Sequence, residues 1–254
     1  NLQIKNSFNY SSYKKDGLIK LIYNQNKSEG NYKFEKNFFN FNYLDKSQDQ
    51  NYKFNGFISL KPFFSEFSGD LGELDSDILL NSNSFMVQLL KTGILNNKNL
   101  NISSKINAKQ ISSFRDLINL SLNIKISEGL VDINQTKFEL KKYADLRITD
   151  SLIYTDNNNL ILDALISINI KDFNEVYKIF QTPLKNRKEI KKIEFNLSYN
   201  FDQQTANLNT IKVNDVINKD VNETLKQLIF KDNQLQNRIY IKNLANKAIK
   251  NYSG

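Results

Sequence analysis

The stretch Ile193-Glu194-Phe195-Asn196-Leu197-Ser198-Tyr199-Asn200-Phe201 alternates apolar and polar residues at every position. Successive side chains of a β-strand point to opposite faces of the sheet. The pattern therefore predicts a strand with one apolar face and one polar face. A function that belongs to such a chain is expected in a surface rather than in a cluster of reactive groups.

A second alternating stretch precedes it, over residues 160–170. Its even positions are all apolar: Leu160, Leu162, Ala164, Ile166, Ile168 and Ile170. The polar run Asp156-Asn157-Asn158-Asn159 predicts the turn that leads into this strand. Strands of this length exceed the usual length of about 5–6 residues, which favours a broad sheet over a small barrel.

Strand patterns recur along most of the chain. The first fifty residues carry four aromatic-rich strand candidates, and further candidates lie over 52–60, 100–106, 120–126, 130–133, 138–140 and 208–213. The residues after Pro62, with Gly69 and Gly72, predict a looser segment. The predicted fold class is mainly β with a few helices: a long, curved, mostly antiparallel sheet that can wrap around an apolar groove.

Helices are predicted at three places. Ser84 can cap a short helix near 85–95, and Asp172 with Glu175 forms a capping box for a helix near 173–181. From about 221 to 249 the apolar spacing becomes helical, which predicts one long helix or two shorter ones. We therefore expect a β-sheet domain over 1–215 and a helical segment over 216–254 that packs on or beside the sheet.

The composition excludes much chemistry. The chain of 254 residues has no Cys and no His, so it cannot form disulfides, thiolate nucleophiles, imidazole bases or the usual zinc sites. We expect no enzyme activity, no cofactor and no metal. Asp70, Glu73, Asp75 and Asp77 form an acidic cluster, which is either a solvated loop or a Ca²⁺ site without the EF-hand pattern.

The net charge of +8 permits attraction to phosphate-rich partners. The basic residues are mostly scattered Lys, and no run of five or more exists, so a nucleic-acid partner is not expected. The sequence contains no run of 18 apolar residues, so no helix that spans a bilayer is predicted. The chain begins at Asn1 without Met or a leader pattern, and any signal or anchor is expected upstream of it.

Several segments follow one another in a characteristic order: Phe54-Asn55-Gly56-Phe57-Ile58-Ser59-Leu60-Lys61-Pro62-Phe63, Leu89-Leu90-Lys91-Thr92-Gly93-Ile94-Leu95, Asn99-Leu100-Asn101-Ile102, the strand over 120–126, Glu128-Gly129-Leu130-Val131-Asp132-Ile133, the helix over 172–180 and the strand pair over 193–213. This order resembles the C-terminal region of the AsmA-like bacterial envelope proteins, a superfamily that includes TamB-type proteins. The resemblance covers roughly residues 50 to 250. These motifs are structural and contain no catalytic signature.

The resemblance implies a periplasmic protein that is tethered to the inner membrane through a segment absent from this chain. It also implies a role in moving or organising phospholipid and in outer-membrane homeostasis. An apolar sheet face that helices do not fully cover would solvate acyl chains without any reactive group. The candidate lipid-groove residues are Leu160, Leu162, Ala164, Ile166, Ile168, Ile170, Ile193, Phe195, Leu197, Tyr199 and Phe201.

Two alternatives stay open at this stage. The helices can cover the sheet, in which case the same residues form an ordinary core. The chain can also be a structural or adhesive β-protein that binds other proteins through sheet edges or loops. The sequence identifies neither the lipid and the direction of its transfer nor the oligomeric state and the protein partners.

Overall fold

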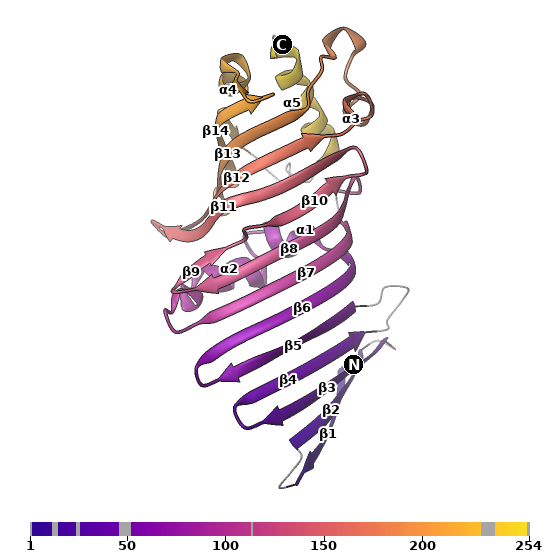
Figure 1. Cartoon of the computed structure of the whole chain (residues 1–254), viewed down its shortest axis with the longest axis vertical. Coiled ribbons are helices and arrows are strands. Elements are labelled where there is room, and N and C mark those ends of the chain that lie inside the picture. Colours follow the sequence, from indigo (N-terminus) through magenta and orange to yellow (C-terminus); the bar gives the residue numbers. More distant parts are fainter. Residues whose placement is uncertain are drawn as a thin grey trace.

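The protein is built on one long, twisted sheet, seen in the computed structural model of Figure 1. The structure describes residues 2–11, 15–23, 26–45, 52–112, 114–229 and 237–252. Sixteen strands of the described residues belong to this sheet, which confirms the predicted fold class of a mainly β protein with a long, mostly antiparallel sheet and a few helices.

The strands follow one another in space nearly in chain order. They are β1 (Leu2–Tyr10), β2 (Lys15–Tyr23), β3 (Asn26–Glu35), β4 (Phe38–Asp45), β5 (Tyr52–Leu60), β6 (Phe63–Leu74), β7 (Asn101–Ile111), β8 (Leu117–Ser127), β9 (Leu130–Asp132), β10 (Thr136–Leu140), β11 (Ala144–Asp156), β12 (Asn159–Ile170), β13 (Lys192–Asn200), β14 (Thr205–Val213), β15 (Val216–Ile217) and β16 (Gln227–Ile229). The short β9 pairs with β8 and β11, and β16 pairs with β14.

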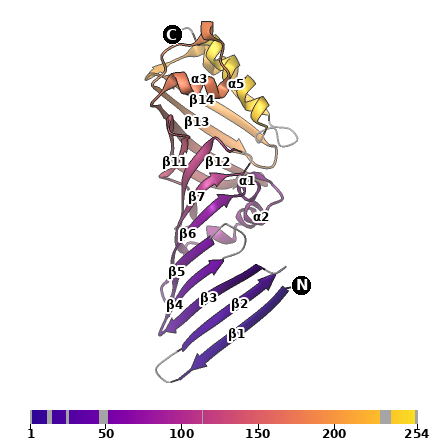
Figure 2. The ribbon, with the colours of Figure 1, turned by 90° about the vertical axis from the view of Figure 1, so that its right-hand side faces the viewer.

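All described pairings are antiparallel except that of β6 with β7, which is parallel. A parallel pair needs a crossover connection, and the crossover here contains α1 (Ser76–Leu80), α2 (Phe85–Lys91) and the 3₁₀ turn η1 (Ile94–Asn96). Later in the chain come α3 (Phe173–Phe180), the 3₁₀ turn η2 (Leu184–Asn186), α4 (Lys219–Leu225) and α5 (Arg238–Asn251). Figure 2 shows α1, α2, α3 and α5 on the same side of the sheet.

The predicted turns and caps have the expected local geometry. Asn157 and Asn158 both have positive φ, as the tight hairpin between β11 and β12 requires. The Ser84 side chain accepts a hydrogen bond from the Val87 N–H, and that of Asp172 accepts one from Glu175, so both predicted helix starts are confirmed. The helix predicted near 85–95 is shorter than expected, because α2 ends at Lys91 and Gly93 adopts a left-handed conformation.

Two sequence expectations were wrong. The segment predicted to be loose is largely a strand, since Asp70, Gly69 and Gly72 all belong to β6. The segment 216–254 is not purely helical, because β15 and β16 join the sheet on either side of α4. Residues 230–236, inside the predicted helical stretch, lie outside the described part of the chain. Within the described ranges, no helix is long and apolar enough to cross a membrane.

Candidate functional site: an apolar sheet face and its cavity

One face of the sheet is apolar from β1 to β14. The antiparallel register aligns the apolar positions of neighbouring strands, as in the row formed by Ile148, Ile166 and Phe195. The same alignment holds at the other end of the sheet, where Tyr32 lies opposite Phe41. The opposite face carries ion pairs such as that between Lys20 and Glu29, although over β4–β6 it also bears the aromatic rings of Phe38, Phe57 and Phe64. The alternation in the sequence thus becomes one continuous apolar surface.

Glycine and aromatic residues share the N-terminal part of this face. A Cβ atom on Gly17 would lie 2.2 Å from the Tyr32 ring, and one on Gly69 would lie 2.6 Å from the Phe54 ring. These aromatic side chains therefore lie flat across the neighbouring strand, over the position where glycine leaves room. Ring contacts continue across strands, with centroid distances of 6.1 Å for Phe8–Tyr32 and 5.7 Å for Tyr32–Phe39.

No described helix lies over β1–β4, as Figure 2 shows. Phe39, Phe41 and Tyr43 are only half-buried, and Ile4 and Phe8 on β1 are exposed. Large exposed apolar surfaces mark sites that contact a partner, a ligand or a membrane. We call this part of the apolar face, over β1–β4, the open face.

Helices cover the C-terminal part of the same face. Val87 of α2 packs against Leu160, Tyr199 and Phe201, and all four side chains are buried. Val176 of α3 packs against Ala144 of β11. Residues of α5 pack against the buried cluster that includes Leu208 and Ile211 of β14. Here the apolar face is an interior surface, in contrast to the open face.

Asp202 joins this helical cover to the sheet. Its carboxylate accepts a hydrogen bond from Lys91 of α2 and another, of 2.9 Å, from the Leu160 N–H at the start of β12. Burial by itself would raise the pKa of Asp202, but these two donors outweigh it and lower the pKa below the usual carboxyl range. The charged form of Asp202 is therefore part of the folded structure.

Replacing Asp202 by asparagine is expected to lower the free energy of unfolding at neutral pH by about 1–3 kcal/mol. Because the folded-state pKa is lowered, the stabilisation is complete above the usual carboxyl pKa of about 4 and is lost as the pH falls through the folded-state pKa. Denaturation curves of the two proteins should therefore converge in acid. Asp145→Asn is the control, because its ion pair with Lys171 is exposed and should contribute little. Equal stability of the Asp202 variant and the wild type at neutral pH would contradict this role.

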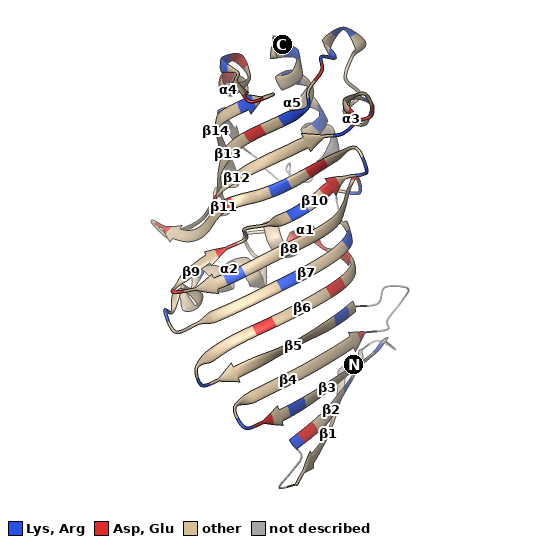
Figure 3. Cartoon of the chain, viewed as in Figure 1, with Lys and Arg blue, Asp and Glu red and all other residues tan. Residues whose placement is uncertain are grey.

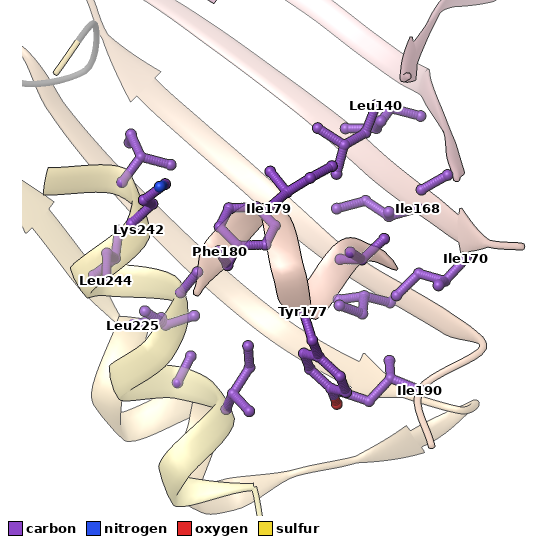
Figure 4. Close-up of a pocket in the computed structure, with 18 of the residues that line it drawn as sticks. Leu140, Ile168, Ile170, Tyr177, Ile179, Phe180, Ile190, Leu225, Lys242 and Leu244 are labelled. Carbon is purple, nitrogen blue, oxygen red and sulfur yellow. The ribbon is translucent and has the colours of Figure 1, made fainter. Parts of the chain in front are cut away.

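A cavity of about 420 Å³ lies between the sheet and the helices α3, α4 and α5. Sheet residues such as Ile168 and Ile170 form one wall, and helix residues such as Phe180 and Leu244 face them (Figure 4). A cavity of about 150 Å³ with an apolar lining already holds a benzene molecule. The space here is nearly three times as large and falls in the range of ligand pockets.

The lining of the cavity is almost entirely apolar. The charged residues among the described lining side chains are Arg115, Asp116 and Lys242, and Asp116 is paired with Lys141 at 3.0 Å. The hydroxyl of Tyr177 donates to the Lys188 carbonyl, and burial raises the pKa of this tyrosine, so it stays protonated. Such a lining suits a hydrocarbon chain.

The structure divides the predicted groove residues into two groups. Ile168, Ile170, Ile193 and Phe195 line the cavity. The others lie outside the lining of this cavity, in the buried or half-buried apolar layer beneath and beside the helices: Leu160, Leu162, Ala164, Ile166, Leu197, Tyr199 and Phe201. The even positions of β12 and the odd positions of β13 do share one face, as the register pairs Ile168 with Ile193 and Leu162 with Tyr199.

Sequence reasoning missed the walls that come from other elements. Ala144 and Leu146 of β11, Ile179 of α3 and Ala245 of α5 also line the cavity. The apolar stripe of α3 is visible in the sequence, but it predicts only that this helix packs against something. In the sequence, glycines such as Gly17 within alternating strands were the feature that could have indicated aromatic rings lying across the open face.

The acidic cluster has structural roles. Asp75 caps α1 and also accepts a hydrogen bond from Ser112, while Asp70 accepts one from Asn107. Asp70 and Glu73 lie on β6, and Asp77 lies in the first turn of α1. Within the described ranges, no group of three or more Asp and Glu side chains is arranged to hold a metal ion.

Comparisons of the chain with protein-family models, with curated proteins and with solved structures found no match.

Proposed function

We propose that this protein is a non-enzymatic lipid-binding protein, which holds the acyl chains of phospholipids against the apolar face of its sheet. The observation that carries the proposal is the continuity of this face from β1 to β14, open over β1–β4 and enclosing an apolar cavity at the other end. Each CH₂ group that leaves water contributes about 0.8 kcal/mol, so a hydrocarbon chain binds without a reacting group.

The open face suits a flexible apolar ligand better than it suits a folded protein partner. The Tyr32 ring lies flat over Gly17 and contacts the rings of Phe8 and Phe39, so the surface presents ring faces rather than deep side-chain sockets. A hydrocarbon chain can contact such a surface at many positions. A role in the cell envelope, in the transfer of phospholipid and in outer-membrane homeostasis belongs to the same proposal, and the sequence resemblance alone supports it.

Photo-cross-linking on one strand tests the proposal. A photoreactive phenylalanine analogue replaces Phe41 on the apolar face of β4, or the adjacent Asn42, whose exposed side chain lies on the polar face. After expression in bacteria and irradiation, we expect phospholipid adducts, identified by mass spectrometry, at position 41 but not at position 42. The neighbouring position is the matched control because it has the same strand and nearly the same depth along the sheet.

The outcome also separates the competing function. Equal lipid labelling at both positions would indicate non-specific contact and contradict the proposal. Protein adducts at position 41, with no phospholipid recovered from the purified protein, would instead favour a structural or adhesive β-protein.

A further inference from the structure

The positive charge of the chain is concentrated at one end of the molecule. Residues 184–192 contain five basic residues and one acidic residue, and α5 contains four basic residues and no acidic one. These two segments together carry +8, which equals the net charge of the whole chain, so the rest of the chain is neutral overall. The adjoining α4 carries Asp220, Glu223 and Lys219 and offsets one unit of this charge.

The two basic segments pack against each other. Asn246 of α5 donates a hydrogen bond of 2.8 Å to the Phe180 carbonyl and accepts one of 2.7 Å from Thr182, just before residues 184–192. Further along, the Lys188 ammonium lies over the ring of Tyr252, with 5.6 Å between its nitrogen and the ring centroid. Figure 3 shows the basic residues of α5 and of the loop after α3 at the same end of the sheet.

Several of these basic side chains point into solvent. Lys185, Lys247 and Lys250 are exposed, and none of them takes part in an ion pair with a described residue. Lys192, in contrast, is already paired with Glu194 and Asp215. We call Lys185, Lys247 and Lys250, together with the exposed Leu184, the basic end patch.

Leu184 adds an apolar contact to this charge. Its side chain is 79% exposed although it lies in the short turn η2, beside Lys185. An exposed leucine beside exposed lysines matches a bilayer surface with anionic headgroups, where the ammonium groups meet phosphates and an apolar side chain enters the acyl boundary. Duplex nucleic acid offers the phosphates but no apolar layer for Leu184.

From these observations we propose that the basic end patch docks the protein on an anionic membrane surface. This inference concerns a surface outside the apolar cavity and does not depend on the proposed lipid-binding function. Attraction between lysines and anionic lipids acts within about one Debye length, so docking should weaken as the salt concentration rises.

Co-sedimentation with vesicles tests this proposal. The wild-type protein should bind vesicles made of equal amounts of phosphatidylcholine and phosphatidylglycerol, and should bind vesicles of phosphatidylcholine alone far more weakly. The triple variant Lys185→Gln, Lys247→Gln, Lys250→Gln should lose at least about tenfold in affinity for the anionic vesicles, because each lysine near an anionic surface contributes. Leu184→Ser should weaken binding by a smaller factor.

A matched variant separates the patch from the net charge. Lys105, Lys125 and Lys137 are exposed on the polar face of β7, β8 and β10, and their triple replacement by glutamine changes the net charge by the same amount. This control should keep wild-type affinity. Equal losses in the two triple variants, equal binding to neutral vesicles, or binding to duplex DNA without binding to anionic vesicles would each overturn the proposal.

Discussion

Replacing Ile166 by aspartate is expected to unfold the C-terminal half of the sheet. Ile166 is 8% exposed and lies between Ile148 and Phe195 on the apolar face. An unpaired carboxylate at such a position costs about 3–5 kcal/mol, a large part of the stability of about 5–15 kcal/mol that a domain typically has. Circular dichroism and urea denaturation measure this loss.

The neighbouring residue supplies the control. Ser167 lies on the opposite face of β12, between Arg147 and Glu194, and Ser167→Asp should change the stability by no more than about 0.5 kcal/mol. If the Ile166 variant instead folds normally and loses only bound lipid, the apolar face is open to solvent at this position. That result would contradict the burial of Ile166.

Filling the cavity is expected to remove bound lipid while the protein stays folded. Ala245 of α5 lines the cavity, so the indole of Ala245→Trp can occupy part of the cavity. We expect little loss of stability and a large fall in the phospholipid that mass spectrometry recovers from the purified protein. The chain has no Trp, so the emission of the introduced indole reports whether it lies in apolar surroundings.

Ala164→Trp is the matched control for this experiment. Ala164 is also buried on the apolar face, but it does not line the cavity, and an indole there must displace packed side chains. Overpacking of this kind costs at least about 1–3 kcal/mol. If the Ala245 variant keeps its full complement of lipid while its indole is buried, the lipid does not occupy the cavity.

Local patterns predicted the strands and helix starts that depend on neighbouring residues. The alternation over 160–170 and 193–201 predicted β12 and β13, and the side chains of Ser84 and Asp172 cap helices as expected. Prediction failed at β6, where Gly69 and Gly72 resemble loop residues. Gly69 is a strand residue because the Phe54 ring of the neighbouring strand occupies the place of its side chain, and no local pattern contains that contact.

The candidate site was predictable only in part. The alternation predicts which residues of β12 and β13 share a face, and four of these residues line the cavity. The remaining walls come from other elements, among them β11, β14, α3, α4 and α5, and the patterns of β12 and β13 do not specify where these elements pack. Likewise, the basic end patch joins residues near 185 with residues near 250, and the sequence shows the charge of each segment but not that the two segments lie together.

By itself, the sequence determined the secondary structure of most strands, the division of β13 into an apolar and a polar side, and the absence of thiol and imidazole chemistry. Only the tertiary structure decided where the apolar face is covered. The reason is physical: side-chain alternation depends on the backbone geometry of one strand, whereas coverage depends on where crossover and terminal helices pack. Around Ile193 to Phe201 those helices turn the apolar face into a core with a cavity, while β1–β4 keep it open.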